Sequence, residues 1–288
     1  SELFSYDGLI TSQITDNTLF DGLVSMNNHG HILSFQSEAD GTNEELLLLD
    51  GTDITLVTDS KIPYEWNVHL NDNDFVVWGG FFEGSFLYDG STITKFEAYV
   101  EEYPDSSIVL ENPDLNNRNQ IVLQGRLMNG SSLEGFAIFL YNGSVLEKVI
   151  GLSPFPYNSI YPNINDNGYI VWQRFDGTDY EIVLYDGVKI TQLTHNDYDD
   201  LEPQINNNGN VVWSSSKGIF FYDGHIILKI PESDHGKAAD FQINDNNYVV
   251  WWARDPFEDA EIFLYDGSKT IKITNNDYDD IRPKINNN

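Results

Sequence analysis

The stretch from residue 203 to residue 213 decides the fold, and it reads Pro-Gln-Ile-Asn-Asn-Asn-Gly-Asn-Val-Val-Trp. After a short loop, residues 218–230 read Gly-Ile-Phe-Phe-Tyr-Asp-Gly-His-Ile-Ile-Leu-Lys-Ile. The apolar runs are short, rich in β-branched and aromatic residues, and separated by Asn-Gly or Asp-Gly, which supply the positive φ that tight hairpin turns need. Pro203 stands where a strand can begin without its missing N–H. The pattern predicts four short antiparallel strands.

This unit is repeated along the chain. A Tyr-Asp-Gly-like tripeptide occurs at Tyr6-Asp7-Gly8, Leu49-Asp50-Gly51, Tyr88-Asp89-Gly90, Tyr141-Asn142-Gly143, Tyr185-Asp186-Gly187, Tyr222-Asp223-Gly224 and Tyr265-Asp266-Gly267. An Ile-Asn-like pair alternates with it, at Met26-Asn27, Leu70-Asn71, Leu115-Asn116, Ile164-Asn165, Ile205-Asn206, Ile243-Asn244 and Ile285-Asn286. No segment keeps a 3.6-residue apolar period over ten residues, so we expect almost no helix. The sequence therefore predicts about seven repeats of roughly 41 residues in one domain, 1–288.

The second strand of each unit, such as Phe75–Trp78 or Tyr248–Trp251, is apolar on both faces. A strand buried on both sides of an antiparallel unit requires sheets stacked face to face. Four-stranded units stacked radially form a β-propeller, whereas the coils of a linear β-solenoid are shorter than these units. We therefore predict an all-β, seven-bladed β-propeller of four-stranded antiparallel blades.

The two ends of the chain suggest how this ring closes. The N-terminus carries a third and a fourth strand, Leu3–Tyr6 and Leu9–Thr15, and the C-terminus carries a first strand, Arg282–Asn286. Pairing them would build a seventh, incomplete blade that lacks its second strand. On this interpretation the chain is an excerpt of a longer protein.

Residues 190–194 (Ile-Thr-Gln-Leu-Thr), with Asp200, Pro203 and the turn 205–209, resemble the TolB-type, WD40-like (PD40) propeller repeat. The later part of that repeat matches Asp176-Gly177 and residues 179–182, and 271–286 repeats its beginning. The repeat's usual Ser-Pro-Asp-Gly turn is replaced here by Asn-Asp-Asn-Gly or Asn-Asn-Asn-Gly. The resemblance covers nearly the whole chain and is strongest over 160–288. It implies the propeller fold, and it leaves function open because such propellers serve as binding platforms, interaction domains or enzymes.

The composition narrows the class of ligand. The 46 Asp and Glu residues outnumber 15 Lys and Arg, which gives a net charge of −31. Such a surface repels nucleic-acid phosphates and anionic lipids. There is no Cys, so disulfides and thiolate metal sites are excluded. No apolar run is long enough to span a membrane. We expect a monomer that binds neither nucleic acid nor membranes, in an extracytoplasmic location as part of a secreted, cell-surface or periplasmic bacterial protein.

In a propeller of this type, the short turns lie on one face and the variable loops on the other. Binding uses variable loops on a rigid scaffold. Aromatic rings beside carboxylates suit a sugar or a cationic peptide segment. The predicted ligand-binding residues are Tyr64, Trp66, Glu101, Glu102, Tyr103, Asp105, Tyr157, Tyr198 and Tyr278. The alternative interpretation is that these aromatic residues fill space between blades.

Two copies of an acidic loop, 195–200 and 275–280, suggest a cation site. Carboxylates with Asn and backbone carbonyls suit Ca²⁺, which takes six to eight oxygens. The predicted metal ligands are Asp197, Asp199, Asp277 and Asp279. Alternatively, the last Asp of each loop caps it through Asx hydrogen bonds. The turns at 71–74 and 165–168 lack the spacing of calcium loops, which favours ordinary turn chemistry there.

Signals for catalysis are weak. The six His residues show no metal-ligand spacing, and neither a Gly-x-Ser-x-Gly elbow nor a phosphate loop is present. We therefore predict a non-catalytic binding module or interaction scaffold that recognises protein or carbohydrate through the variable loops, with calcium as a candidate cofactor. The alternatives are a carbohydrate-active hydrolase or lyase that uses channel carboxylates, and a structural spacer.

Overall fold

The structure is a computed structural model. It describes residues 4–6, 11–13, 16, 18–38, 45–51, 53–58, 65–80, 84–98, 106–154, 158–233, 239–254 and 259–287. These residues form strands and turns and contain no helix, so none that could cross a membrane.

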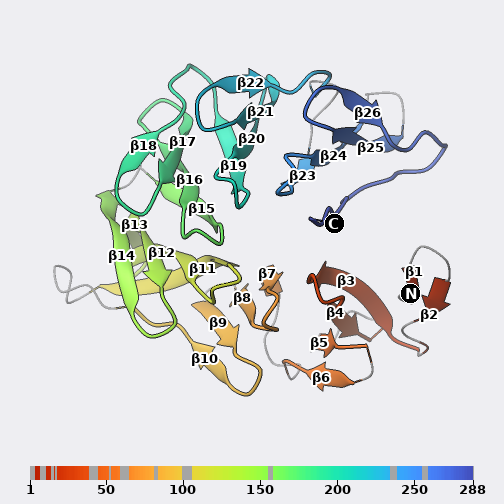
Figure 1. The fold of residues 1–288 in the computed structure, drawn as a ribbon. Helices are drawn as coiled ribbons and strands as arrows, with labels where there is room; N and C mark the ends of the chain where they lie inside the picture. The colour runs from red at the N-terminus through yellow and green to blue at the C-terminus, as the bar shows by residue number, and fades with distance from the viewer. Residues whose placement is uncertain are drawn as a thin grey trace.

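Six four-stranded antiparallel sheets follow one another along the chain, each with its strands in sequence order. They are β3 (Phe20–Met26), β4 (Ile32–Ser37), β5 (Glu45–Leu49) and β6 (Ile54–Leu56); β7 (Glu65–Leu70), β8 (Val76–Gly80), β9 (Gly84–Tyr88) and β10 (Ile93–Lys95); β11 (Ser107–Leu115), β12 (Ile121–Asn129), β13 (Ser132–Tyr141) and β14 (Leu146–Pro154); β15 (Ser159–Ile164), β16 (Ile170–Phe175), β17 (Tyr180–Tyr185) and β18 (Ile190–Gln192); β19 (Asp200–Ile205), β20 (Val211–Ser215), β21 (Gly218–Tyr222) and β22 (Ile227–Lys229); and β23 (Ala239–Ile243), β24 (Val249–Arg254), β25 (Ala260–Tyr265) and β26 (Thr270–Lys272). Figure 1 shows these blades arranged around an axis, with the first strand of each innermost. The β-propeller fold is thus confirmed.

The predicted number of blades is wrong, because the propeller has six four-stranded blades and not seven. The N-terminal hairpin, β1 (Phe4–Tyr6) with β2 (Thr11–Gln13), forms a separate two-stranded sheet, and among the described residues it pairs with no other strand. The predicted strand Arg282–Asn286 does not form. A chain segment can therefore repeat the Ile-Asn signal without building a blade around it.

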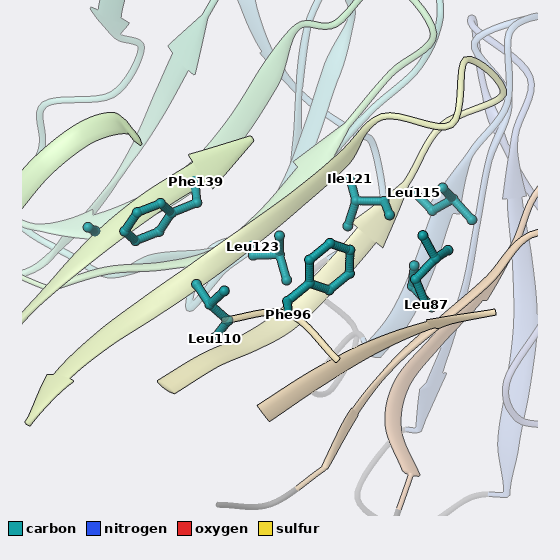
Figure 2. Packing of buried hydrophobic residues seen from close by; sticks show 9 residues of the cluster. Leu87, Phe96, Leu110, Leu115, Ile121, Leu123 and Phe139 are labelled. Atoms are coloured by element: carbon teal, nitrogen blue, oxygen red, sulfur yellow. The ribbon is translucent and has the colours of Figure 1, made fainter. Parts of the chain in front are cut away.

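The core lies between successive blades. One cluster packs Val77 and Leu87 of one blade against Leu110, Ile121 and Leu123 of the next (Figure 2). Equivalent clusters fill the interfaces on either side of it and further round the ring. Burying this apolar surface provides the main driving force for stacking the sheets.

The second strands are buried on both faces, as predicted. The largest fully buried side chains are their tryptophans, Trp78, Trp172, Trp213 and Trp251. Three of these rings stack on a Phe of the third strand, at centroid distances of 5.6 Å for Trp78–Phe86, 6.0 Å for Trp213–Phe220 and 5.7 Å for Trp251–Phe263. The strand tryptophans therefore hold the blades together and are not exposed for ligands.

Candidate functional site

The short-turn face is held by a ring of asparagines. In each first-to-second turn the Asn of the Ile-Asn pair is buried, and its Oδ1 accepts the N–H groups two and four residues later, as Asn71 does from Asn73 and Phe75 (3.0 Å each). Its Nδ2 donates to a backbone carbonyl of the next blade. These inter-blade bonds run Asn27 to Asn71 (3.1 Å), Asn71 to Asn116 (2.9 Å), Asn116 to Asn165 (2.8 Å), Asn165 to Asn206 (2.8 Å), Asn206 to Asn244 (3.0 Å) and Asn244 to Asn286 (2.9 Å). The turn interpretation is confirmed, and the Asn also joins the blades.

The last bond of this ring explains why the repeat count gave seven. Asn244 donates to the carbonyl of Asn286, and Asp245 N donates to Asn287 Oδ1 (2.8 Å), although residues 281–287 form no strand. The Ile-Asn signal therefore marks a contact that one blade makes with the next turn. That contact needs only the turn residues and not a complete sheet.

On the other side of the ring, the first strands contain a repeated irregularity. In all six blades the pairing of the first and second strands shifts register at one point. In five of them the residue at that point has a left-handed backbone conformation: Asn67 (φ 52°), Asn112 (φ 49°), Tyr161 (φ 55°), Glu202 (φ 55°) and Asp240 (φ 47°). Such a conformation costs a non-glycine residue about 1 kcal/mol or more, and bulges of this kind re-aim side chains. We call these five positions the bulge ring.

Side chains of the preceding blade hold two members of the bulge ring in place. Tyr161 N donates to Gln124 Oε1 (3.2 Å), and Glu202 N donates to Gln173 Oε1 (2.7 Å). Both glutamines are buried in second strands. The strained backbone is therefore fixed by bonds from the scaffold, which keeps the bulge residues in one orientation.

Three members of the bulge ring, Asn67, Asn112 and Tyr161, border a recess of about 480 Å³ on the variable-loop side, lined by residues of β7, β8, β11, β12, β13 and β15 together with Asn158. We call it the axial recess. Its polar wall contains Gln124, which donates to Glu111 Oε1 (2.7 Å) and accepts from Asn112 (3.1 Å). Arg126 Nη2 lies 3.2 Å from Glu111 Oε2. Burial raises the pKa of Glu111, and Arg126 and Gln124 act against that rise.

A second hollow of about 310 Å³ lies along the first strands, and we call it the inner channel. Asn67, Asn112 and Tyr161 border both spaces. The inner channel is acidic, since Asp114, Glu202 and Asp240 line it. Asp114 is buried and accepts from Asn163 Nδ2 (2.5 Å), and its Oδ1 lies 3.1 Å from His69 Nδ1, whereas Glu202 and Asp240 are exposed.

Most of the predicted ligand-binding residues lie outside the described part of the chain: Tyr64, Glu101, Glu102, Tyr103, Asp105 and Tyr157. Trp66 lies in β7, paired with Gly79 of β8, one residue before the bulge residue Asn67. Tyr198 is half-buried, packed on Phe220 at 6.5 Å with Lys217 Nζ 5.9 Å from its ring, while Tyr278 is 77% exposed. The two tyrosines thus differ, and their roles as ligand contacts stay predictions.

The acidic loops lie beside the second-to-third turns of their neighbouring strands. Asp199 Oδ1 accepts from Tyr180 N (3.0 Å), and Asp279 Oδ1 accepts from Ala260 N (2.9 Å). Asp197 and Asp277 are exposed. A metal role for these four residues stays a prediction, and Asp199 and Asp279 have a structural role in addition.

The last Asp of the first loop closes it through bonds to side chains, and not through the Asx hydrogen bonds of the alternative interpretation. Asp200 is 1% exposed; its Oδ2 accepts from Asn196 Nδ2 (2.7 Å) and its Oδ1 from the indole N–H of Trp213 (2.9 Å). Burial raises its pKa from 3.8 to about 6. The turn aspartates behave in the opposite way: backbone hydrogen bonds from Thr92 and Ser91 lower the pKa of Asp89 to about 2.

Sequence reasoning missed three acids and a histidine that the fold brings together. Ligand atoms of Asp176, Glu181 and His195 all lie within 4.8 Å of one another, and the Asp179 carboxylate interacts electrostatically with Asp176. It also missed the bulge ring. The sequence contains a signal for each of them. For the cluster, the acidic turn 175–181 precedes the acidic loop 195–200; for the bulge ring, the residue before a Pro recurs at Asn112, Tyr161 and Glu202.

Comparison with known proteins shows the fold and nothing finer. No family model and no curated protein sequence matches the chain. The β-propeller domain of the trilobed protease from Pyrococcus furiosus, described as having an open velcro topology, is similar with a TM-score of 0.64 and 14% identity over 95% of this chain and 93% of that one. A putative TolB from Agrobacterium tumefaciens is similar with a TM-score of 0.55 and 15% identity over 77% of this chain and 84% of that one. The predicted TolB-type propeller fold is thus confirmed.

A Pyrococcus horikoshii acylaminoacyl peptidase is similar with a TM-score of 0.63 and 14% identity, over 96% of this chain. This chain covers only 48% of that peptidase. It therefore spans about half the length of such relatives, and at this identity the likeness concerns the fold alone.

Proposed function

We propose that this propeller is a non-catalytic binding module that takes an extended, positively charged peptide segment into the axial recess and the inner channel. The observation that carries the proposal is the bulge ring. Its residues adopt a left-handed backbone conformation in blade after blade, which is costly above all for Tyr161 and Glu202, and they border the two hollows. Strain of this kind concentrates where a ligand is bound.

The chemistry of the lining favours a peptide over a neutral sugar. Amide side chains such as Asn112 and Gln124 match the donors and acceptors of a peptide backbone, and about 480 Å³ lies within the usual size of a ligand pocket. The exposed carboxylates of Glu202 and Asp240 attract Lys or Arg side chains, and a net charge of −31 speeds the encounter with cationic partners. A neutral glycan can donate hydroxyl hydrogen bonds to these carboxylates, but it gains no attraction between opposite charges.

A protein ligand, the lack of catalysis, the monomeric state and an extracytoplasmic location remain parts of this proposal. The similarity to protease and peptidase propellers is compatible with it, since the names of those proteins refer to peptide substrates. The calcium predicted from the acidic loops is not needed for this site.

The test measures binding of fluorescent peptide libraries of basic, neutral and acidic composition, and of neutral oligosaccharides, by anisotropy at two salt concentrations. We expect basic peptides to bind, more weakly at high salt. The double variant Glu202→Gln/Asp240→Asn should weaken binding tenfold or more, and Glu147→Gln, an exposed acid on β14, should leave it unchanged. Equal binding of acidic peptides, binding of oligosaccharides alone, or release of cleaved product would each contradict the proposal.

A further inference from the structure

A cluster of acids and one histidine lies on the variable-loop face, outside the axial recess. The β16–β17 turn provides Asp176 and Asp179, β17 provides Glu181, and the loop after β18 provides His195 and Asp199. The ligand atoms of Asp176, Glu181 and His195 lie within 4.8 Å of one another. Turn and loop are tied together by the bond from Tyr180 N to Asp199 Oδ1 (3.0 Å), so the groups are held near each other by the backbone.

Asp179 gives this cluster an unbalanced charge. Its side chain is 6% exposed, and both carboxylate oxygens are buried without a hydrogen-bond donor among the described residues. The carboxylates of Asp176, Asp199 and Asp197 lie close enough to repel its charge, and the hydroxyl of the neighbouring Thr178 offsets part of this repulsion. A buried carboxylate that faces other carboxylates is costly unless a cation lies beside it.

The basic side chain that the strand pairing places opposite Glu181 does not supply that cation. Arg174, which pairs with Glu181 across β16 and β17, donates instead to Gln192 Oε1 (2.5 Å). Gln192 in turn donates to Thr194 O (2.9 Å) and lies 3.5 Å from His195 Nδ1. The carboxylates of the cluster are thus surrounded by amides, a hydroxyl and an imidazole.

Glu181 is already oriented as a ligand would be. It is fully buried, its Oε1 accepts from Asn196 N (3.0 Å), and its other oxygen accepts from Thr194 Oγ1. Each carboxylate oxygen keeps a second lone pair. Bonds of this kind fix the direction of metal-ligating carboxylates.

We propose that Asp176, Glu181 and His195, with Asp179 beside them, bind one divalent transition-metal ion, with Zn²⁺ as the best fit. Two carboxylates and an imidazole form the donor set of a zinc site that keeps a fourth position for water or another carboxylate. Ca²⁺ takes oxygen ligands only, so the imidazole argues against the calcium predicted from the sequence. The proposal is independent of the peptide-binding function, because none of these residues lines the axial recess or the inner channel.

The experiment is a calorimetric titration of the whole, chelator-treated chain with zinc chloride, together with thermal unfolding. We expect one ion per chain and a higher unfolding midpoint with the metal. His195→Ala and Asp176→Ala should weaken binding tenfold or more. His225→Ala, an exposed histidine in a short turn, and Asp259→Asn, at the position equivalent to Asp179 in the last blade, should bind as the wild type does.

Asp179→Asn gives a second, independent measurement. Without metal it should raise the unfolding midpoint, because it removes a buried like charge, and it should abolish the rise that zinc causes. No heat and no midpoint shift at millimolar zinc would overturn the proposal. Zinc binding by His195→Ala at the wild-type affinity would also overturn it. So would a calcium response that His195→Ala leaves intact. The same holds if Asp179→Asn lowers the unfolding midpoint in the absence of metal.

Discussion

The same acidic loop is built twice in this propeller, once beside the blade β15–β18 and once beside the blade β23–β26. In both copies a Glu of the third strand accepts from a Thr and from a loop N–H: Thr194 and Asn196 bond Glu181, and Thr274 (2.5 Å) and Asn276 (3.1 Å) bond Glu261. The repeated acids therefore shape the loop in the same way in each copy.

The copies differ in how their charge is balanced. In the last blade, Lys272 lies 3.5 Å from Glu261, and Arg254 pairs with Asp279. In the earlier blade Gln192 stands where Lys272 does, and Phe175 stands where Arg254 does. Hydrogen bonds from loop N–H groups to the acids thus define the loop, whereas the counter-charge varies: side chains supply it in one copy, and on our proposal a bound ion supplies it in the other.

The largest expected difference between the copies lies at the Asp that closes each loop. Asp200 is buried and accepts from the Trp213 indole and from Asn196, so Asp200→Ala leaves buried donors without an acceptor and should cost about 2 kcal/mol. Asp280 accepts from Asn276 Nδ2 (2.6 Å) and is less buried. Asp280→Ala should cost less than about 1 kcal/mol. Urea unfolding of the two variants measures both values.

Asn196→Ala is the control for this prediction. It removes the other donor, from an exposed residue, and leaves Asp200 with the Trp213 indole, so it should cost part of what Asp200→Ala costs. If Asp280→Ala destabilised the chain as much as Asp200→Ala, burial would not be the cause of the difference.

The stability contributed by Asp200 should also depend on pH. Its pKa is raised by burial from 3.8 to about 6, so between these values the folded chain holds a proton that the unfolded chain releases. Stability therefore rises as the pH falls through 6 towards 4, and the full cost of the charge is present above pH 6. Relative to Asp200→Asn, the free energy of unfolding of the wild type should increase by on the order of 2 kcal/mol as the pH falls from 7.5 to 4.5. Urea unfolding measures this difference.

The variant Asp280→Asn provides the matched curve, because Asp280 closes the second loop as Asp200 closes the first and is more exposed. A flat difference between the wild type and Asp200→Asn across that pH range would mean that Asp200 is charged in both states at pH 4.5.

The blade structure followed from the sequence because its signals are local. The Asn-Gly and Asp-Gly turns and the apolar runs beside Trp213 each specify a hairpin within one unit. The number of blades did not follow, since the Ile285-Asn286 pair satisfies the turn of the neighbouring blade without a strand of its own. Counting repeats by their turn motif therefore overestimates the number of blades, because a motif that only contacts a neighbouring blade is counted as well.

The site was less predictable, because it depends on contacts between blades and between distant segments. The left-handed conformation of Tyr161 relies on Gln124 in another blade, and the exposed loop acids gave no hint that Asp179 would be buried beside them. The sequence predicted function on the variable-loop face and in the acidic loops, and both stay predictions. Only the folded structure shows which acids lie close together and which of them accept a hydrogen bond.

The loop tyrosines offer a smaller test of the comparison. Tyr198 packs against Phe220 and under Lys217, whereas Tyr278 is 77% exposed. Tyr198→Ala should cost about 1 kcal/mol through lost packing, and Tyr278→Ala should change stability by less than about 0.5 kcal/mol. Thermal unfolding of both variants decides this. A large loss at Tyr278 would show that the second loop is packed more closely than its exposure indicates.

The smallest effect comes from exchanging the counter-charges themselves. Gln192→Lys would place an ammonium group beside Glu181, as Lys272 lies beside Glu261, and Lys272→Gln would remove one. Each substitution should move the unfolding midpoint by less than about 2 °C, upward for the first and downward for the second, because such ion pairs near the surface contribute little. The informative result is the response to zinc: Gln192→Lys should abolish it, since the fixed cation replaces the bound one, and Lys272→Gln should leave it unchanged. If the Gln192→Lys protein bound zinc as the wild type does, the missing counter-charge in the first loop would not be the reason for metal binding. The difference in charge between the two loops would then not explain their different response to zinc.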